Sequence, residues 1–441
     1  MRKSMCMVNL TVLLATVACS IPCHAQLNND NAPWEMFAKR LISRLSVPDV
    51  NGKITNFQLV KQPTYADWLD PKSGDWNFLT FANRLAPPGE FYAPVDLTLY
   101  QQYSDFLGSL DLPPVDPKQA AATDKARKEW LRATEGYKEI DKRKVKVWAE
   151  FDAAQKALPA SERTHYQVWL AREYGAKLGA QQQLVSEKAY KYSLLLADTY
   201  KGFSGIGALI ANLPNTQYKK TVTSANDVVT TMPTFAYDAN FASFVQKGDS
   251  GTGFEETWLF DKNHERRTLT WSSRSGSAGI KIGWFSAGGS ASGSRESLDI
   301  FKDGVSMTVK FKNFTTIPIT PGPWYNGDAI KALWTGPYKA GAIANKDSLF
   351  GPQGSFKPRV SQVVLVHRPS VTLKLDASQY SKVVETWSGS GSIGIGPFGF
   401  RGGARGGKDE MISDAASNTV TFEDKTGIPQ IVAVYTISYP Q

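Results

Sequence analysis

The strongest constraint on the fold is a heptad pattern in the second quarter of the sequence. Apolar residues recur there at alternating spacings of four and three, which keeps one apolar stripe on one side of an α-helix. Asp116-Pro117 precedes the stripe and favours helix initiation, because an acidic N-cap is followed by proline at the first helical position. We therefore predict a helix of about 40 residues, roughly 60 Å long. The repeating positions are Ala126, Trp130, Ala133, Tyr137, Ile140, Lys144, Val147, Phe151, Ala154 and Leu158, with Lys144 as the polar interruption.

A second helix follows a short break. Leu158-Pro159-Ala160-Ser161 interrupts the first helix, and Ser161 can cap another that runs to about Tyr200. Because the break is short, we predict that residues 116–200 form an antiparallel helical hairpin. The apolar face of the second helix comprises Tyr166, Trp169, Leu170, Tyr174, Leu178, Val185, Tyr192 and Leu195.

The charge of this hairpin and the segment after it each have two interpretations. Residues 118–200 hold 16 Lys or Arg and 11 Asp or Glu, within a chain of formal net charge +9. These charges either solvate the outer faces of long helices or bind an anionic membrane or polyanion. The apolar, glycine-containing segment 202–213 is either a buried connector against the hairpin or a membrane-inserting segment kept buried in the soluble form.

From about residue 220 onward the sequence has the two-residue period of β-strands. Met307, Val309 and Phe311 alternate with polar residues, and the same alternation recurs over residues 371–375. An internal duplication lies within this region, because residues 275–294 align with 388–407 at an offset of 113 with ten of twenty positions identical. We therefore predict a duplicated β unit.

Both copies contain hairpins rich in Gly and Ser, a composition with weak β propensity. One explanation is that the hairpins leave the soluble fold and form a transmembrane β-barrel, with small residues in the lumen and large apolar residues towards lipid. Another is close packing of a neighbouring element against the glycines, and a third is a flexible loop. The residues expected to contact a membrane or ligand are Ile280, Ile282, Trp284, Phe285, Ile393, Ile395 and Phe398.

Two further groups of residues are candidate contacts. Trp324, Tyr325, Trp334 and Tyr338 lie among turn residues, where aromatic rings suit sugar stacking or the headgroup region of a membrane. The alternative is that they fill the base of the β domain. Arg401 and Arg405 flank glycines that leave backbone N–H groups accessible, so we consider them candidate anion contacts against the alternative of a solvated turn.

The N-terminus has the organisation of a secretory signal peptide. Basic Arg2 and Lys3 precede a short apolar stretch, and small residues precede a junction after Ala25. Lipidation at Cys19 is the alternative. Cleavage after Ala25 removes all three cysteines and lowers the formal net charge to +7, so the mature protein would contain no disulfide or thiolate ligand. We expect secretion, with the periplasm or cell surface as the destination.

Catalytic motifs are largely absent. Gly248-Asp249-Ser250-Gly251 resembles the nucleophile signature of trypsin-like serine proteases over four residues, but the Ala-Ala-His-Cys motif of that family is missing. Dispersed histidines without cysteine do not make a zinc site, and no nucleotide-binding motif occurs. Glu255-Glu256 leaves a glycosidase pair open. We assign no catalytic, metal or cofactor residues and favour a non-enzymatic protein.

These observations predict an α+β fold in which a long antiparallel helical hairpin precedes a duplicated β-sandwich-like region with Gly/Ser-rich hairpins. We expect a secreted, pore-forming or toxin-like protein that acts at membranes, with homo-oligomerisation left open and no nucleic-acid partner. The alternatives are an adhesive or carbohydrate-binding surface protein that binds a cell-surface glycan, and an extracellular hydrolase. The expected segments are a signal peptide (1–25), an irregular N-terminal region (26–115), the hairpin (116–200), an apolar connector (201–254) and the β domain (255–441, copies at about 255–320 and 362–441).

Overall fold

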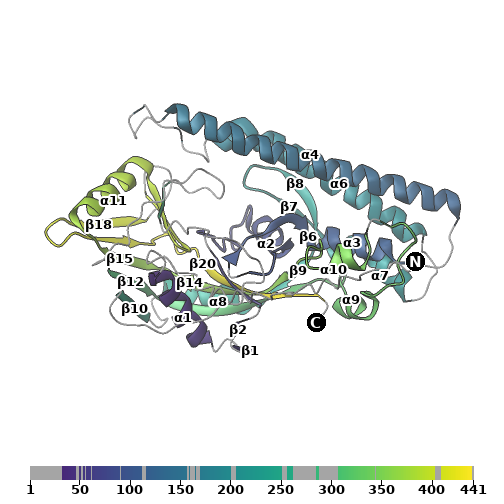
Figure 1. Ribbon diagram of the computed structural model, residues 1–441. Coiled ribbons are helices and arrows are strands. Elements are labelled where there is room, and N and C mark those ends of the chain that lie inside the picture. Colours follow the sequence, from purple (N-terminus) through teal and green to yellow (C-terminus); the bar gives the residue numbers. More distant parts are fainter. Residues whose placement is uncertain are drawn as a thin grey trace, which may run out of the picture.

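The fold mixes helix and sheet, with the long helix α4 (Pro117–Gln155) running along one side of several β-sheets (Figure 1). The predicted signal peptide lies outside the described residues. The computed structural model of the protein describes residues 32–45, 49–50, 53–54, 56–60, 62–89, 91–111, 116–155, 158, 164, 169–199, 205–250, 256–261, 285–287, 306–342, 344–402 and 409–439.

The largest sheet contains eight strands and joins the N-terminal region to the C-terminal strand. Leu59 of β3 lies opposite Ala433 of β20, and β14 at the centre of the sheet pairs with both β20 and β13. The apolar runs of β14 and β20 are buried because both faces of the sheet are covered. The main strand order is β5 (Phe91–Tyr92), β3 (Phe57–Val60), β20 (Gln430–Ile437), β14 (Arg359–His367), β13 (Asn313–Pro321) and β9 (Phe235–Tyr237). Strand β4 (Arg84–Leu85) pairs with β14, and β6 (Val95–Thr98) pairs with β4.

A five-stranded antiparallel sheet continues from the first. Only Lys312 separates β12 from β13, and two residues separate β14 from β15. Ser306 pairs with Lys374 and Asn313 pairs with His367, so one ladder crosses from the smaller sheet into the larger one. The predicted alternation in β12 and β15 is confirmed, since every second residue is buried. The strand order is β10 (Glu256–Asp261), β12 (Ser306–Phe311), β15 (Ser370–Lys374), β19 (Thr419–Glu423) and β18 (Glu410–Asp414).

The strand pairs of this sheet follow the offset of 113 found in the sequence. Thr257 of β10 lies opposite Lys310 of β12, and Ser370 of β15 lies opposite Glu423 of β19. Adding 113 to each number of the first pair gives the second pair. The two antiparallel registers are therefore related by the offset of the Gly/Ser segments, whereas the sequences of β12 and β19 match at an offset of 111, as in Phe311 and Phe422.

A helix that the sequence reading missed precedes the second Gly/Ser segment and extends into its first residues. Helix α11 (Ala377–Ser390) begins after Asp376, whose side chain accepts the Gln379 backbone N–H at 2.8 Å, and it ends at Gly391 with φ of 62°. Only glycine adopts this left-handed conformation without strain. Strands β16 (Ser392–Ile395) and β17 (Phe398–Arg401) follow, and β16 pairs on its other edge with β11 (Phe285–Ala287).

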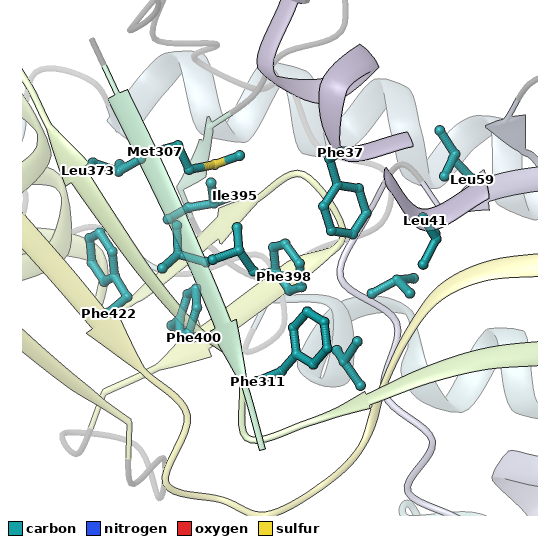
Figure 2. Close-up of a cluster of buried hydrophobic side chains, with 14 of the residues drawn as sticks. Phe37, Leu41, Leu59, Met307, Phe311, Leu373, Ile395, Phe398, Phe400 and Phe422 are labelled. Carbon is teal, nitrogen blue, oxygen red and sulfur yellow. The ribbon is translucent and has the colours of Figure 1, made fainter. Parts of the chain in front are cut away.

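A hydrophobic core lies between the two larger sheets and this small hairpin. Figure 2 shows Phe37 of α1 (Ala32–Leu45) pointing towards Phe398, whose ring centroid lies 5.4 Å away. Ile395 and Phe400 of the hairpin pack with residues of the five-stranded sheet such as Phe422. Helix α1 and the hairpin thereby cover the apolar face of the five-stranded sheet.

The opposite face of the eight-stranded sheet is covered by α2 (Gly74–Ala82) and α8 (Asn240–Asp249). Trp68 is at the centre of this second core, and its ring lies 5.0 Å from Phe78 and 5.0 Å from Phe241. Aromatic residues of the N-terminal region thus form a packing cluster beneath the sheet.

Helix α4 begins at Pro117, as the sequence predicts, and packs along α6 (Ala176–Thr199), which follows a short π-helical segment at Ala171–Gly175. The Thr123 hydroxyl contacts that of Thr199, and the Trp130 ring stacks on Tyr192. Further along, the ring centroids of Trp148 and Trp169 are 5.2 Å apart. The paired residue numbers run in opposite order along the two helices. The heptad positions Ala126, Trp130 and Ala133 are buried. Towards the end of the helix the pattern fails, because the heptad position Ala154 is exposed whereas Trp148, which lies outside the heptad pattern, is buried.

The base of the long helices packs on a third core. Gly108 of α3 (Leu99–Ser109) lies against Tyr192 so closely that a Cβ would overlap the tyrosine hydroxyl, and Ile210 of α7 (Ile206–Asn212) is fully buried. No helix in the described ranges is both long and apolar enough to cross a bilayer. The remaining elements are β1 (Asp49–Val50), β2 (Lys53–Ile54), the 3-10 turn Thr216–Tyr218, β7 (Lys219–Thr223), β8 (Val229–Pro233), α9 (Gly327–Leu333) and α10 (Lys346–Phe350).

Candidate functional site

The apolar residues predicted as membrane or ligand contacts are buried wherever their side chains are described. Ile393, Ile395 and Phe398 are at most 2% exposed and belong to the core beneath the five-stranded sheet. Phe285 lies in β11 opposite Ile395. Ile393, Ile395 and Phe398 therefore offer no contact surface in this conformation. Ile280, Ile282, Trp284 and Arg405 lie outside the described residues.

The glycines of the β16–β17 hairpin are close-packed. A Cβ on Gly399 would lie 2.3 Å from the Tyr65 hydroxyl and 2.6 Å from Pro63 Cβ, and a Cβ on Gly402 would lie 2.9 Å from the Trp387 ring. A larger side chain at either position would overlap these neighbours. Close packing, one of the three explanations of the Gly/Ser composition, therefore accounts for these two positions.

The aromatic loop residues pack mainly against the third core. Trp324 is 1% exposed, and its indole N–H donates to the Thr234 carbonyl oxygen at 2.7 Å. Tyr325 is half-buried and its hydroxyl hydrogen-bonds to that of Tyr439. Trp334 and Tyr338 are partly exposed, and Tyr338 donates to the Trp334 carbonyl oxygen at 2.7 Å. These four residues do not converge on one open surface.

Arg401 is exposed and belongs to a polar cluster at the end of β17. Its guanidinium lies 4.1 Å from the centre of the Tyr65 ring, and its backbone N–H donates to the Asp409 carboxylate at 2.6 Å. Asp409 is almost fully buried, and burial together with the nearby Asp424 raises the pKa of its carboxyl group to about 6. The cluster holds the chain on both sides of the segment that contains Arg405.

A separate opening lies between the long helices and the N-terminal region. It is a cavity of about 800 Å³. One wall is formed by α4 and α6, and the opposite wall by β4, β6 and the start of α3. Strands β7 and β8 close a third side, where they extend from α2 to α6 (Figure 1). Four segments that are far apart in sequence therefore enclose one space.

Hydroxyl and amide side chains are the most numerous polar groups in the lining of this cavity, beside apolar residues such as Val95, Val185 and Met232. The chemistry suits a polar ligand, because such groups both donate and accept hydrogen bonds. The hydroxyl and amide residues are Thr80, Thr98, Thr134, Thr216, Thr221, Thr230, Thr231, Ser186, Asn83, Gln101, Gln182 and Gln183, and the charged ones are Arg84, Asp141, Lys144, Glu187 and Lys219.

Lys219 lies at the centre of the aromatic part of this lining. Its ammonium is 4.0 Å from the centre of the Tyr190 ring and 5.0 Å from that of Tyr100, and it donates to the Tyr100 hydroxyl at 3.1 Å. The Tyr100 hydroxyl in turn donates to the Leu213 carbonyl oxygen at 3.0 Å. Burial lowers the pKa of the Lys219 ammonium to about 8 and raises the pKa of Tyr100 above its ordinary value.

Lys144, a second lysine of the cavity, is buried and its charge is neutralised. Lys144, the polar interruption of the heptad, has 10% of its side chain exposed and forms an ion pair with Asp141 one helical turn away. The sequence pattern therefore located a residue of this cavity without indicating its role. Lys144 contributes little net charge to the cavity, because its partner is adjacent.

Sequence reasoning missed Lys219, Tyr100 and Tyr190. The available signals were the uncharged run Gln181-Gln182-Gln183 within a charged helix and the threonine-rich strands 219–233. Neither signal indicates that the two segments face each other. Among the described residues, no cluster of His, Cys, Asp or Glu is arranged to hold a metal ion. No protein-family model, curated protein or solved structure matches this chain.

Proposed function

We propose that the protein is a secreted, non-enzymatic binding protein for a carbohydrate of a cell surface. The main support for carbohydrate binding is the cavity of about 800 Å³, whose lining contains many hydroxyl and amide groups. Its volume falls within the range of about 300–1,000 Å³ usual for small-molecule sites. A saccharide presents many hydroxyl groups that pair with such a lining, and each pairing must replace a hydrogen bond to water.

The aromatic residues of the cavity suit the same ligand. Tyr100, Tyr137 and Tyr190 each combine an apolar ring with a polar tip. A sugar ring likewise combines an apolar face with a rim of hydroxyl groups, so stacking and hydrogen bonding can occur together. Secretion, with cleavage after Ala25 and delivery to the periplasm or cell surface, is part of this proposal, because a cell-surface glycan lies outside the cytoplasm.

The proposal is tested with a glycan array and two substitutions in one helix. Ser186→Trp places an indole into the cavity lining, whereas Leu184→Trp places one at a position of α6 that is 37% exposed and outside the lining. We expect the wild type and Leu184→Trp to bind the same glycans and Ser186→Trp to lose at least tenfold in affinity, or about 1.4 kcal/mol. Equal binding by all three proteins, or no glycan bound by the wild type, would contradict the proposal.

A second candidate function is pore formation at a membrane, which one feature of the β16–β17 hairpin favours. Ile393, Ile395, Phe398 and Phe400 lie on one face of the hairpin, and Gly394 and Gly399 on the other. A transmembrane strand has the same alternation of apolar and small residues. In this account the hairpins leave the core, and the positively charged helices bind anionic lipid first.

Dye release separates the two functions. Purified protein without residues 1–25 is added to liposomes of neutral or anionic lipid that contain a self-quenched dye. Release would favour pore formation, whereas a glycan signal without release favours the binding protein. A hydrolase is the remaining alternative and predicts that the bound glycan is shortened during incubation.

We also propose that residues 255–320 and 362–441 are two copies of one β unit arranged in a sandwich-like region, which the long helical hairpin precedes. The shared offset of 113 in sequence and in strand register supports this proposal. Strand β11 of the first copy pairs with β16 of the second, so the two units contribute strands to one sheet.

A further inference from the structure

We infer that the cavity recognises an acidic saccharide, with a carboxylate or sulfate group of the ligand bound at the Lys219 ammonium. The inference rests on the proposed carbohydrate-binding function and adds the ligand's charge and the residue that selects it. Three observations lead to it: the lack of a carboxylate partner for Lys219, the unused donors of its ammonium, and the excess of cationic over anionic side chains in the cavity lining.

Lys219 differs from neighbouring lysines in its partners. Lys220, the next residue, forms an ion pair with Asp75 at 2.6 Å on the outside of β7. Lys72 pairs with Asp227 at 2.8 Å. Lys219 forms no ion pair with any described carboxylate, and its described contacts are the rings of Tyr100 and Tyr190 and the Tyr100 hydroxyl. Lys219 is therefore the least exposed of these three lysines and the one that has no ion-pair partner among the described residues.

An ammonium in this position is costly for the protein alone. Tyrosine rings attract a cation through their quadrupoles, but they compensate only part of the lost hydration. Burial lowers the pKa of Lys219 to about 8, so the ammonium is still the main form at pH 7. An anion that enters the cavity supplies the missing counter-charge, and the low local dielectric strengthens the attraction.

The hydrogen-bonding capacity of Lys219 also remains open. An ammonium has three N–H donors, and among its described contacts one donates to Tyr100. Because the Tyr100 hydroxyl uses its own hydrogen on Leu213, its oxygen is fixed as the acceptor from Lys219. Two donors are left for the oxygens of a ligand. A carboxylate or a sulfate offers oxygens that accept both.

The remaining charges of the cavity favour the same sign of ligand. The Asp141 carboxylate is paired with Lys144, and Glu187 is exposed. Arg84, also in the lining, is exposed and forms no ion pair with a described residue. A neutral saccharide would leave Lys219 without a counter-charge, whereas an acidic one is attracted by both cations.

The test compares three versions of one disaccharide: neutral, with a terminal uronic acid, and sulfated. Their affinities are measured by calorimetry at pH 7 for wild type, Lys219→Met, Lys219→Arg and the matched control Lys220→Met. We expect the wild type to bind at least one acidic form with at least tenfold higher affinity than the neutral form. Comparison of the two acidic forms then shows whether the site prefers a carboxylate or a sulfate. Lys219→Met should lose this preference, while Lys219→Arg and Lys220→Met should keep it.

The outcomes separate this inference from the function on which it depends. Equal affinity for neutral and acidic forms, or an unchanged preference in Lys219→Met, would overturn the role of Lys219 while carbohydrate binding stands. If no form binds and Ser186→Trp changes nothing on the array, the binding function itself fails and the inference with it. Thermal unfolding of each variant shows whether it is folded. If Lys219→Met is unfolded, Lys219→Arg tests the inference instead, because it keeps the positive charge and should keep the preference for the acidic form.

Discussion

The side chain of Gln430 forms two hydrogen bonds to the backbone of Gly399. Its amide oxygen accepts the Gly399 N–H at 2.8 Å, and its amide nitrogen donates to the Gly399 carbonyl oxygen at 2.9 Å. Gln430 is fully buried at the start of β20, and Gly399 lies in the middle of β17. A side chain therefore replaces the missing neighbouring strand at this edge of the hairpin, and it satisfies backbone groups that would otherwise be buried unpaired.

This arrangement predicts that Gly399→Ala destabilises the fold. The added methyl group would overlap the Tyr65 hydroxyl and the Pro63 ring and would push β17 away from Gln430. We expect the free energy of unfolding, measured with urea, to fall by about 1–3 kcal/mol. Gly89→Ala is the control, because a Cβ there meets no atom within 4 Å and should change stability by less than about 0.5 kcal/mol. Equal stability of the two variants would show that the hairpin is loosely packed.

The stacked rings of Trp130 and Tyr192 predict that a charged substitution at their contact strongly destabilises the fold. The ring centroids are 5.6 Å apart with an angle of 12°, and Trp130 is 2% exposed. Trp130→Asp buries an unpaired charge and should cost about 3–5 kcal/mol. Leu131→Asp at the next residue, which is 38% exposed, should cost less than about 1 kcal/mol. Urea unfolding followed by circular dichroism checks both, and similar losses would contradict the assigned face.

Asp409 predicts a dependence of stability on pH. Burial and the nearby Asp424 raise the pKa of its carboxyl group from the ordinary 3.8 to about 6, so the folded state binds a proton more tightly than the unfolded state. This contribution to stability is therefore present at low pH and is lost as the pH rises to 6. Asp409→Asn should remove this slope, which amounts to at most about 2–3 kcal/mol.

Asp414 on β18 provides a control of opposite sign. The Ser417 hydroxyl lowers the pKa of the exposed Asp414 carboxyl group, so its contribution is present at neutral pH and is lost as the pH falls. Urea unfolding between about pH 2 and pH 7 compares Asp409→Asn with Asp414→Asn, because the Asp414 contribution is lost only below the ordinary carboxyl pKa. A slope that is unchanged in Asp409→Asn would assign the pH dependence to other groups.

Lys219 predicts a substitution that increases stability. Because burial lowers its pKa to about 8, the unfolded state binds more protons between pH 8 and the ordinary lysine value, and stability rises with pH in that window. Lys219→Met should remove this rise and increase the unfolding free energy at pH 7 by about 1 kcal/mol. Lys220→Met should change it by at most about 1 kcal/mol in the opposite direction. A Lys219→Met protein that is less stable at pH 7 would indicate a structural role.

An engineered disulfide tests whether the Gly/Ser hairpins move. Ala287 of β11 lies opposite Ile393 of β16, and the sequence beyond residue 25 contains no cysteine. Paired strand positions have the spacing that a disulfide needs. If pore formation requires the hairpins to separate, the Ala287→Cys/Ile393→Cys protein should release no dye when oxidised and regain release on reduction.

The control for this experiment is a disulfide in the fixed ladder. Thr308→Cys/Thr372→Cys joins β12 to β15, which lie opposite each other in the five-stranded sheet. Its dye release should not respond to oxidation. Equal release by the oxidised and reduced 287–393 protein would mean that these hairpins stay in place, and pore formation by their movement would be wrong.

Local sequence patterns determined much of the secondary structure. The start of α4 followed from Asp116-Pro117, and the buried faces of β12 and β15 followed from their two-residue alternation. These predictions succeeded because the information lies within a few residues of the chain. The missed helix α11 shows the limit, since Val383 and Trp387 have helical spacing after the N-cap Asp376, but the surrounding Ser and Gly suggested a strand or loop.

The sequence by itself thus determined where a long helix runs, which strand faces are apolar and which segments repeat. Only the tertiary structure decided that Ile393 and Phe398 are buried and that Lys219 meets Tyr100 and Tyr190 in a polar cavity. The physical reason is that helix and strand periods arise from contacts between near neighbours, whereas burial and the loss of hydration at Lys219 depend on α3, α6 and β7 packing together. Those segments are distant in sequence, so no local pattern specifies their meeting.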